Sequence, residues 1–293
     1  MKKIVKKIYH KLNPVHAVTS DELIGKYIQN GRIPWSPGYE LYKWKSIKDA
    51  LDSDSVLQSL GKGRLNPEFG IGLDERIVEY PWIFSLLGKG TGRLLDAGST
   101  FNFETILDQD RIKSRELSIY TFHPEHRSFN ERKISYLYGD LRCLPFRDNW
   151  FDEVVCQSTI EHIDMDNSIY GYDLKGIEEP RKKSYEYLKV VEELIRVTQK
   201  GGQLLISFPY GRFENHGFFQ QFDREMLGRI EEMLKPEGKF ELAFFRYFKD
   251  GWKMVKQEEC DTAESFNPHT GAGKGEDGAA HCRGICGIKF IKA

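Results

Sequence analysis

The pattern of apolar and polar residues changes near residue 92. Before it, apolar residues recur at helical spacing and predict helices over 20–30, 39–51 and 73–87. Thr19, followed three residues later by Glu22, is typical of a capping box at the first of these helices. Pro81 is expected to start a new helical segment, because proline disrupts a helix interior.

After residue 92, short apolar runs alternate with helical stretches. Strands are expected over 93–98, 117–122, 135–138, 151–156, 203–208, 240–248 and 287–291, with helices over 185–197 and 226–234. This alternation indicates an α/β fold whose mostly parallel sheet is covered by helices. We therefore divide the chain into a helical N-terminal extension, 1–72, and an α/β domain, 73–293. Residues 257–281 are polar and rich in glycine, which predicts a long loop or a flexible lid.

Composition narrows the classes of protein that this chain can represent. Its 293 residues carry a formal net charge of −1, which argues against a nucleic-acid partner. No apolar run approaches membrane-spanning length and no signal peptide is visible. Five cysteines, an odd number, favour a reducing compartment, so we expect a soluble cytoplasmic protein.

Residues 1–12 form a lysine-rich amphipathic pattern that predicts a short helix. Such a helix could make a peripheral contact with the anionic inner face of a membrane. The alternative, which we favour, is a helix docked on its own protein with solvated lysines, because stable anchoring usually takes two signals.

The stretch 139–163 has the layout of a ligand site. An acidic turn precedes a buried strand, and polar residues follow the carboxyl end of that strand. In open α/β sheets, ligands bind outside the carboxyl ends of the strands, where the strand order reverses.

Several motifs, in order, carry a resemblance to a known family. Segments 94–98, 139–146, 151–152, 158–162 and 193–206 resemble the class I S-adenosylmethionine-dependent methyltransferases, over roughly residues 73–255. The closest subgroup includes ubiquinone-type and sugar methyltransferases. Segments 73–76, 79–82 and 217–223 look like methyltransferases found among bacterial surface-polysaccharide genes. The resemblance implies a Rossmann-like, seven-stranded, mostly parallel sheet and S-adenosyl-L-methionine as cofactor.

The same resemblance implies which residues bind the cofactor. Asp96 would orient the ammonium group, and Gly98 would let the backbone approach the ligand. Asp140 would accept from the adenine amino group, with Leu141 on the adenine face. Ser99 and Ser158 complete the cofactor set at the ends of their strands. Taken alone, Asp96 could instead cap the following helix and Asp140 could stabilise a turn.

Two departures from the family concern the cofactor. Gly98 is followed by Ser99 and not by further glycines. The acidic residue that ends the second strand in the family is replaced by His123, with Glu125 two residues further on. Either Glu125 reaches back to the ribose or His123 makes a weaker contact.

Transfer of a methyl group to a hydroxyl needs a base, for which His162 and His216 are the candidates. Each could instead be a structural or surface residue. We also expect four polar residues near these histidines to contact the acceptor: Glu161, Tyr210, Arg212 and Gln220. Aromatic and polar residues on the loop 209–217 would suit a sugar, so the acceptor is expected to be a small molecule or glycan.

Two sets of residues raise the question of a metal. Asp164, Asp166 and Asn167 could hold Mg²⁺, but a solvated acidic loop is the interpretation we favour. Histidines and cysteines also gather late in the chain at spacings that are not typical of zinc sites: Cys260, His269, His281, Cys282 and Cys286. We therefore predict no metal.

The sequence thus predicts O-methylation of a sugar in a bacterial glycan or its precursor. One alternative is methylation of a lipid or a quinone-like molecule. Another is a methyltransferase-like binding protein without catalysis, suggested by the two departures from the family.

Overall fold

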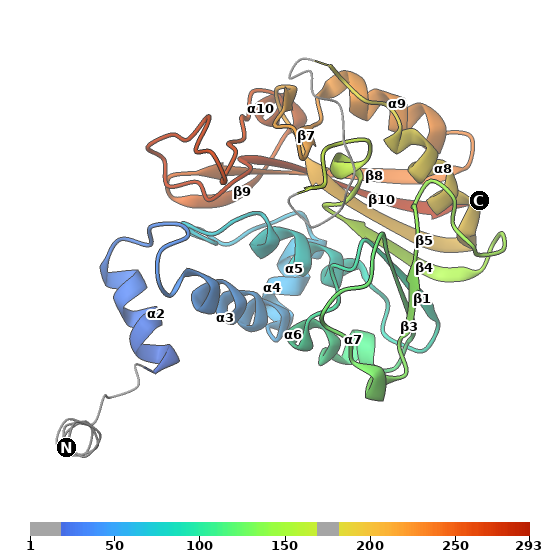
Figure 1. Cartoon of the computed structure of the whole chain (residues 1–293), viewed down its shortest axis with the longest axis horizontal. Helices are drawn as coiled ribbons and strands as arrows, with labels where there is room; N and C mark the ends of the chain where they lie inside the picture. The colour runs from blue at the N-terminus through green and yellow to red at the C-terminus, as the bar shows by residue number, and fades with distance from the viewer. Residues whose placement is uncertain (1–18, 169–181) are drawn as a thin grey trace, which may run out of the picture.

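The computed structural model describes residues 19–168 and 182–293 (Figure 1). The predicted basic helix over 1–12 lies outside these residues, so its membrane contact stays a prediction. Within the described residues, no helix is long and apolar enough to cross a membrane.

Among the described residues, four helices precede the sheet: α2 (Ser20–Gln29), α3 (Tyr39–Leu51), α4 (Asp54–Gly61) and α5 (Arg76–Leu86). The capping box of α2 is confirmed, because Thr19 Oγ1 accepts from the backbone N–H of Glu22 and the Glu22 carboxylate accepts from that of Thr19. The prediction for Pro81 was wrong, since Pro81 lies inside α5. Residues on both sides of Pro81 are buried, so tertiary packing holds α5 together across the proline.

In the part of the chain that the structure describes, the central sheet has eight strands, one more than predicted. Their bounds are β1 (Arg93–Ala97), β2 (Glu116–Thr121), β3 (Ser135–Tyr138), β4 (Phe151–Gln157), β5 (Thr198–Pro209), β8 (Gly238–Phe248), β9 (Gly251–Val255) and β10 (Gly284–Lys292). They lie in the order β3-β2-β1-β4-β5-β10-β8-β9. The first five strands pair in parallel, and β10 is antiparallel to both β5 and β8. The additional strand is β9, which forms a hairpin with β8.

Helices cover both faces of this sheet. The remaining helices are α6 (Glu104–Leu107), α7 (Asp110–Lys113), α8 (Tyr187–Val197), α9 (Arg224–Leu234) and α10 (Gln257–Cys260), with short 3₁₀ turns at Asn130–Arg132 and Ile160–His162. Figure 1 shows α8 and α9 on one face, and α3 to α7 on the other. Neighbouring strand residues point to opposite faces, so Leu94 packs with α5 and Leu95 with α8. This arrangement confirms the predicted Rossmann-like α/β fold.

The N-terminal helices hold the segment that starts α5. Lys43 is buried and its Nζ lies 3.0 Å from a carboxylate oxygen of Asp74. Tyr39 Oη donates to the same carboxylate at 2.8 Å. Residues of α2 and α3 share one hydrophobic cluster with Leu94 and Ile119 of the sheet. The boundary at residue 72 stays a prediction, but the extension packs directly on the α/β core.

The segment 257–281 begins with α10 and continues as a long loop. Several of its side chains are buried, among them Cys260, Ala263 and Phe266. The predicted loop is therefore present and packed against the domain, while its movement as a lid stays a prediction.

Candidate functional site

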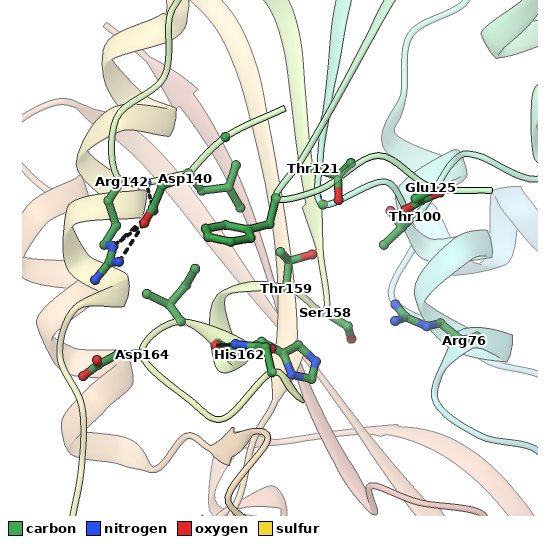
Figure 2. Close-up of a pocket in the computed structure, with 16 residues that line it drawn as sticks. Arg76, Thr100, Thr121, Glu125, Asp140, Arg142, Ser158, Thr159, His162 and Asp164 are labelled. Carbon is green, nitrogen blue, oxygen red and sulfur yellow. Dashed lines mark hydrogen bonds and ion pairs between the residues drawn. The ribbon is translucent and has the colours of Figure 1, made fainter. Parts of the chain in front are cut away.

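A cavity of about 290 Å³ opens at the carboxyl ends of β1, β2, β3 and β4. Figure 2 shows Arg76 and Asp140 on opposite sides of it, with Ser158, Thr159 and His162 between them. The residues that line it are Arg76, Gly98, Thr100, Thr121, Phe122, Glu125, Gly139, Asp140, Leu141, Arg142, Ser158, Thr159, His162, Ile163, Asp164 and Asn167. Because β1 and β4 are neighbours although β2 and β3 follow β1 in the chain, the cavity lies where the strand order reverses.

Gly98, directly after β1, brings two loops close together. Its φ of +128° lies in a region that favours glycine. A Cβ atom on Gly98 would lie 2.1 Å from Oγ1 of Thr159. The glycine is therefore required by the approach of Thr159, and its Cα faces the cavity without a side chain. Ser99, which follows in a left-handed conformation, is buried and does not line the cavity.

Asp96 holds the turn after β1 and does not line the cavity. Its carboxylate is fully buried and accepts from the backbone N–H groups of Thr100 and Phe101, at 3.2 and 2.7 Å, and from the Thr100 hydroxyl. Burial raises the pKa of Asp96 to about 7, against the opposing effect of these hydrogen bonds. These bonds hold the turn at residues 100–101 and do not reach the first turn of α6 (Glu104–Leu107), so Asp96 does not cap that helix. A contact of Asp96 with an ammonium group stays a prediction.

The structure distinguishes the two candidates that follow β2. Glu125 lines the cavity, and one of its carboxylate oxygens accepts from Asn102 Nδ2 at 2.8 Å. His123 is exposed, packs against Phe122 and is absent from the cavity lining. Of the two, Glu125 is placed to contact a ligand.

Asp140, after β3, is held in place by Arg142. The Arg142 guanidinium donates to both carboxylate oxygens, at 2.7–3.1 Å, and its backbone N–H donates to one of them. Burial raises the pKa of Asp140, but the hydrogen bonds from Arg142 outweigh it, so the pKa lies below its usual value. The carboxylate is therefore ionised at neutral pH, next to the apolar side chain of Leu141 in the cavity wall.

Ser158, after β4, is held by a hydrogen bond to Glu79 of α5. The Ser158 hydroxyl donates to Glu79 Oε1 at 2.6 Å, and the Ser207 hydroxyl donates to the same oxygen at 2.7 Å. Arg76 pairs with the other oxygen of Glu79 at 3.2 Å. Glu79 is fully buried, and burial raises its pKa. One buried carboxylate thus connects two strands to the helix that presents Arg76 to the cavity.

His162 lies in the 3₁₀ turn after β4 and lines the cavity. Its Nδ1 lies 2.7 Å from the backbone carbonyl oxygen of Phe218. A carbonyl can only accept, so Nδ1 carries a proton and Nε2 is the basic nitrogen of the neutral ring. Burial lowers the pKa of His162 to about 4, which keeps the ring neutral at physiological pH.

The other predicted acceptor residues lie outside the cavity lining. His216 Nε2 contacts Ser265 Oγ at 2.9 Å, and its ring stacks on Phe219. The loop after β5 runs into the small hairpin of β6 (Glu214–Asn215) and β7 (Gln220–Gln221), which packs on the segment after α10. The predictions for this loop assumed that it covers the switch point, whereas these contacts direct it toward residues 261–267.

Each of the four expected acceptor residues has other contacts. Tyr210 donates to Asp261, and Arg212 is exposed and pairs with Glu264. Gln220 exchanges two hydrogen bonds with the backbone of Ser184. Glu161 is buried, burial raises its pKa, and its Oε1 atom lies 3.8 Å from Nε2 of His162. None of the four lines the cavity.

The suggested Mg²⁺ ligands hold their own loop together. Asp164 accepts from the Ser184 hydroxyl at 2.8 Å, and Asp166 accepts from the backbone N–H of Ser168. Asn167 Nδ2 donates to the carbonyl oxygen of His162. Asp164 and Asn167 also line the cavity, so their polar groups are available to a ligand there.

Sequence reasoning gave no site role to Arg76 or Glu79. Both stand in segments that carry the looser family resemblance, but nothing near them in the chain indicates a site. Their partners Ser158 and Ser207 lie 79 and 128 residues after Glu79. The one available signal was a charged pair inside an otherwise apolar helix.

The comparisons with known proteins point to one domain type. Residues 88–206 match the model of a family described as a methyltransferase domain. This range contains every residue of the cavity lining except Arg76. No curated protein matches the sequence.

Several solved protein structures are similar in fold to this chain, at low sequence identity. The 1,6-didemethyltoxoflavin-N1-methyltransferase of Burkholderia thailandensis is 10% identical with a TM-score of 0.43, and the match covers 94% of this chain and 88% of that one. An S-adenosylmethionine-dependent methyltransferase of Thermotoga maritima is 14% identical with a TM-score of 0.41, over 92% and 99% of the two chains. A [4+2]-cyclase is 16% identical with a TM-score of 0.39, over 69% and 75%. At these values the similarities assign no activity.

Proposed function

We propose that this protein is an S-adenosyl-L-methionine-dependent methyltransferase that binds its cofactor in the cavity at the switch point. The observation that carries the proposal is the cavity lining, which comes from the loops after four adjacent parallel strands inside the methyltransferase-domain match.

The residues of the cavity fit the parts of this cofactor. Phe122 and Leu141 offer apolar faces to the adenine ring, and the ionised Asp140 can accept from the adenine amino group. The carboxylate of Glu125 can accept from the ribose hydroxyls. The bound cofactor supplies a methyl group on a positively charged sulfur.

His162 would be the base. In methyl transfer to a hydroxyl, the acceptor oxygen bonds to the methyl carbon as the carbon–sulfur bond breaks and its electron pair stays on sulfur. The hydroxyl proton leaves to Nε2 of His162, while the Phe218 carbonyl keeps Nδ1 protonated and fixes the ring. His216 is a weaker candidate, because it does not line the cavity.

A polyhydroxylated acceptor, a sugar of a glycan or its precursor, suits this cavity best. Arg76, Asp164 and Asn167 surround His162 with donors and acceptors of hydrogen bonds. A lipid or quinone-like acceptor would require a more apolar wall on this side. The loop 209–217, which first suggested a sugar, gives no support because its side chains lie elsewhere.

Calorimetry with S-adenosylmethionine and its demethylated product tests the cofactor site. Saturable binding of one cofactor per chain is expected, and its absence would overturn the proposal. Transfer of a labelled methyl group into isolated glycan precursors, compared with a lipid extract, then tests the acceptor class. Cofactor binding without transfer to either fraction would favour a non-catalytic binding protein.

A further inference from the structure

Three side chains from distant parts of the chain meet beside the start of α5. The ligand atoms of Glu75, His281 and Cys282 all lie within 4.8 Å of one another. His281 Nδ1 lies 3.2 Å from Glu75 Oε1 and 3.1 Å from Cys282 Sγ. We propose that Glu75, His281 and Cys282 bind a zinc ion through one oxygen, one nitrogen and one sulfur atom.

The geometry of the three atoms is close to that of a zinc site. Bond lengths of about 2.0–2.3 Å from zinc to oxygen, nitrogen and sulfur place tetrahedral ligand atoms about 3.3–3.7 Å apart. His281 Nδ1 directs either its proton or its lone pair toward both Glu75 and Cys282. A metal ion in place of that proton needs the His281 Nδ1 atom to move only a few tenths of an ångström away from Glu75 Oε1 and from Cys282 Sγ.

The chemistry of the donors selects the metal. A thiolate with an imidazole and a carboxylate in a tetrahedral arrangement suits Zn²⁺, whereas Mg²⁺ and Ca²⁺ prefer oxygen alone. One carboxylate and one thiolate balance the two charges of Zn²⁺. This balance matters because Glu75 and Cys282 are buried, 7% and 1% exposed.

A second observation also points to a ligand. The Oε2 atom of Glu75 is buried and makes no hydrogen bond with the described residues. A buried carboxylate oxygen without a partner is costly, and a metal ion in reach of Glu75 would remove that cost.

The site lies on the acceptor side of the proposed methyltransferase cavity. His281 packs on Phe218 and Phe219, the same two rings that pack on His162. Among the described residues, three ligand groups meet here, so water or a bound molecule would supply a fourth ligand. The zinc site does not rest on the proposed methyl transfer, because these three residues are separate from the cavity lining.

Metal analysis of the full chain, without added cofactor, tests the proposal. Purified protein incubated with Zn²⁺ and freed of excess ion should retain one zinc per chain by plasma mass spectrometry. Cys282→Ser, His281→Gln and Glu75→Gln should each weaken zinc binding at least about tenfold in competition with a chelating dye. Cobalt in place of zinc should give a thiolate-to-cobalt absorption band that Cys282→Ser abolishes.

A matched control separates this site from adventitious thiol binding. Cys143 is exposed and lies outside the cluster, so Cys143→Ser should bind zinc as the unmodified chain does. Circular dichroism shows which variants fold. If Cys282→Ser does not fold, the conservative variant Glu75→Gln gives a second test of the site. Absence of stoichiometric zinc in the unmodified chain, or full retention of zinc by folded Cys282→Ser and Glu75→Gln, would overturn the proposal.

Discussion

The Nδ1 atom of His162 and the backbone carbonyl oxygen of Phe218 lie 2.7 Å apart, across 56 residues of sequence. This contact fixes both the orientation and the tautomer of a histidine in the cavity wall. The side chain of Phe218 also stacks against the same ring. The residue that contributes the basic nitrogen is therefore positioned by the loop after β5, although the side chains of that loop do not line the cavity.

Replacing His162 by Gln should slow methyl transfer by about 10²–10⁴-fold, the usual contribution of a positioned base. Cofactor affinity should stay within about twofold by calorimetry, because the cofactor-binding residues are elsewhere in the cavity. His216→Gln provides the comparison and should keep turnover within a few-fold. Equal losses in both variants would contradict the assignment of the base.

The pH dependence of turnover should reflect the same histidine. Burial lowers the pKa of His162 to about 4, so its basic form is already present at neutral pH. The rate constant kcat should stay level as pH falls from 8 and decrease only as pH approaches this value. A steep decrease near pH 6.5, measured under saturating substrates, would show that an unshifted histidine acts instead.

Replacing Asp140 by Ala should weaken cofactor binding by about 10–100-fold, as expected for a lost hydrogen bond to a charged group. The variant also removes one of the two carboxylate partners of Arg142 and leaves Glu186 as the other. Asp148→Ala is the control, because Asp148 is an exposed acid on the same loop and pairs with Arg196. Calorimetry would contradict the adenine assignment if both variants bound the cofactor equally well.

Replacing Gly98 by Ala should destabilise the protein by about 1–3 kcal/mol, the cost of a strained backbone conformation. The new Cβ would also collide with Thr159. Gly228 is the control, since it lies inside α9 with open space around it. Gly228→Ala should stabilise by about 0.5–1 kcal/mol. Urea denaturation measures both, and equal effects would contradict the assigned role of Gly98.

Asp96 should make stability depend on pH. Burial raises its pKa in the folded protein to about 7, from 3.8. Between these values the folded state binds more protons than the unfolded chain, so this carboxyl makes the free energy of unfolding fall as pH rises. Asp96→Asn should remove this part of the slope between pH 4 and pH 7 in urea denaturation. Identical slopes in the two proteins would show that Asp96 is ionised throughout.

The bounds of helices and strands that depend on the local sequence pattern were predicted closely. The bounds of α3 and β3 agree with the sequence prediction, and β3 ends directly before Gly139, a residue type that marks turns. The position of Pro81 inside a helix and the existence of β9 were not predicted, because both depend on contacts with other parts of the chain. Burial on both sides stabilises α5 across the proline, and β9 forms by pairing with the preceding β8. Neither effect is visible in a single segment.

Some residues of the candidate site could likewise be predicted from local sequence, whereas others depend on contacts between distant segments. Gly98, Asp140 and His162 could be placed from sequence because each directly follows a strand, and strand ends meet at one edge of the sheet. Arg76 and Glu79 could not, since Glu79, which pairs with Arg76, bonds Ser158 after β4 and Ser207 of β5, far along the chain. The direction of the loop after β5 also depends on a distant segment, the residues after α10, so the contacts of its side chains could not be derived from the loop alone.

The position of β10 has a consequence for biosynthesis. This strand lies between β5 and β8, and both neighbours precede it in the chain. While the ribosome is still adding β10, the facing edges of β5 and β8 have no partner, and direct pairing between them would exclude it. Completion of the sheet therefore requires β10 to insert between two strands that are already made, and the edges of β5 and β8 are exposed to wrong pairing until it does.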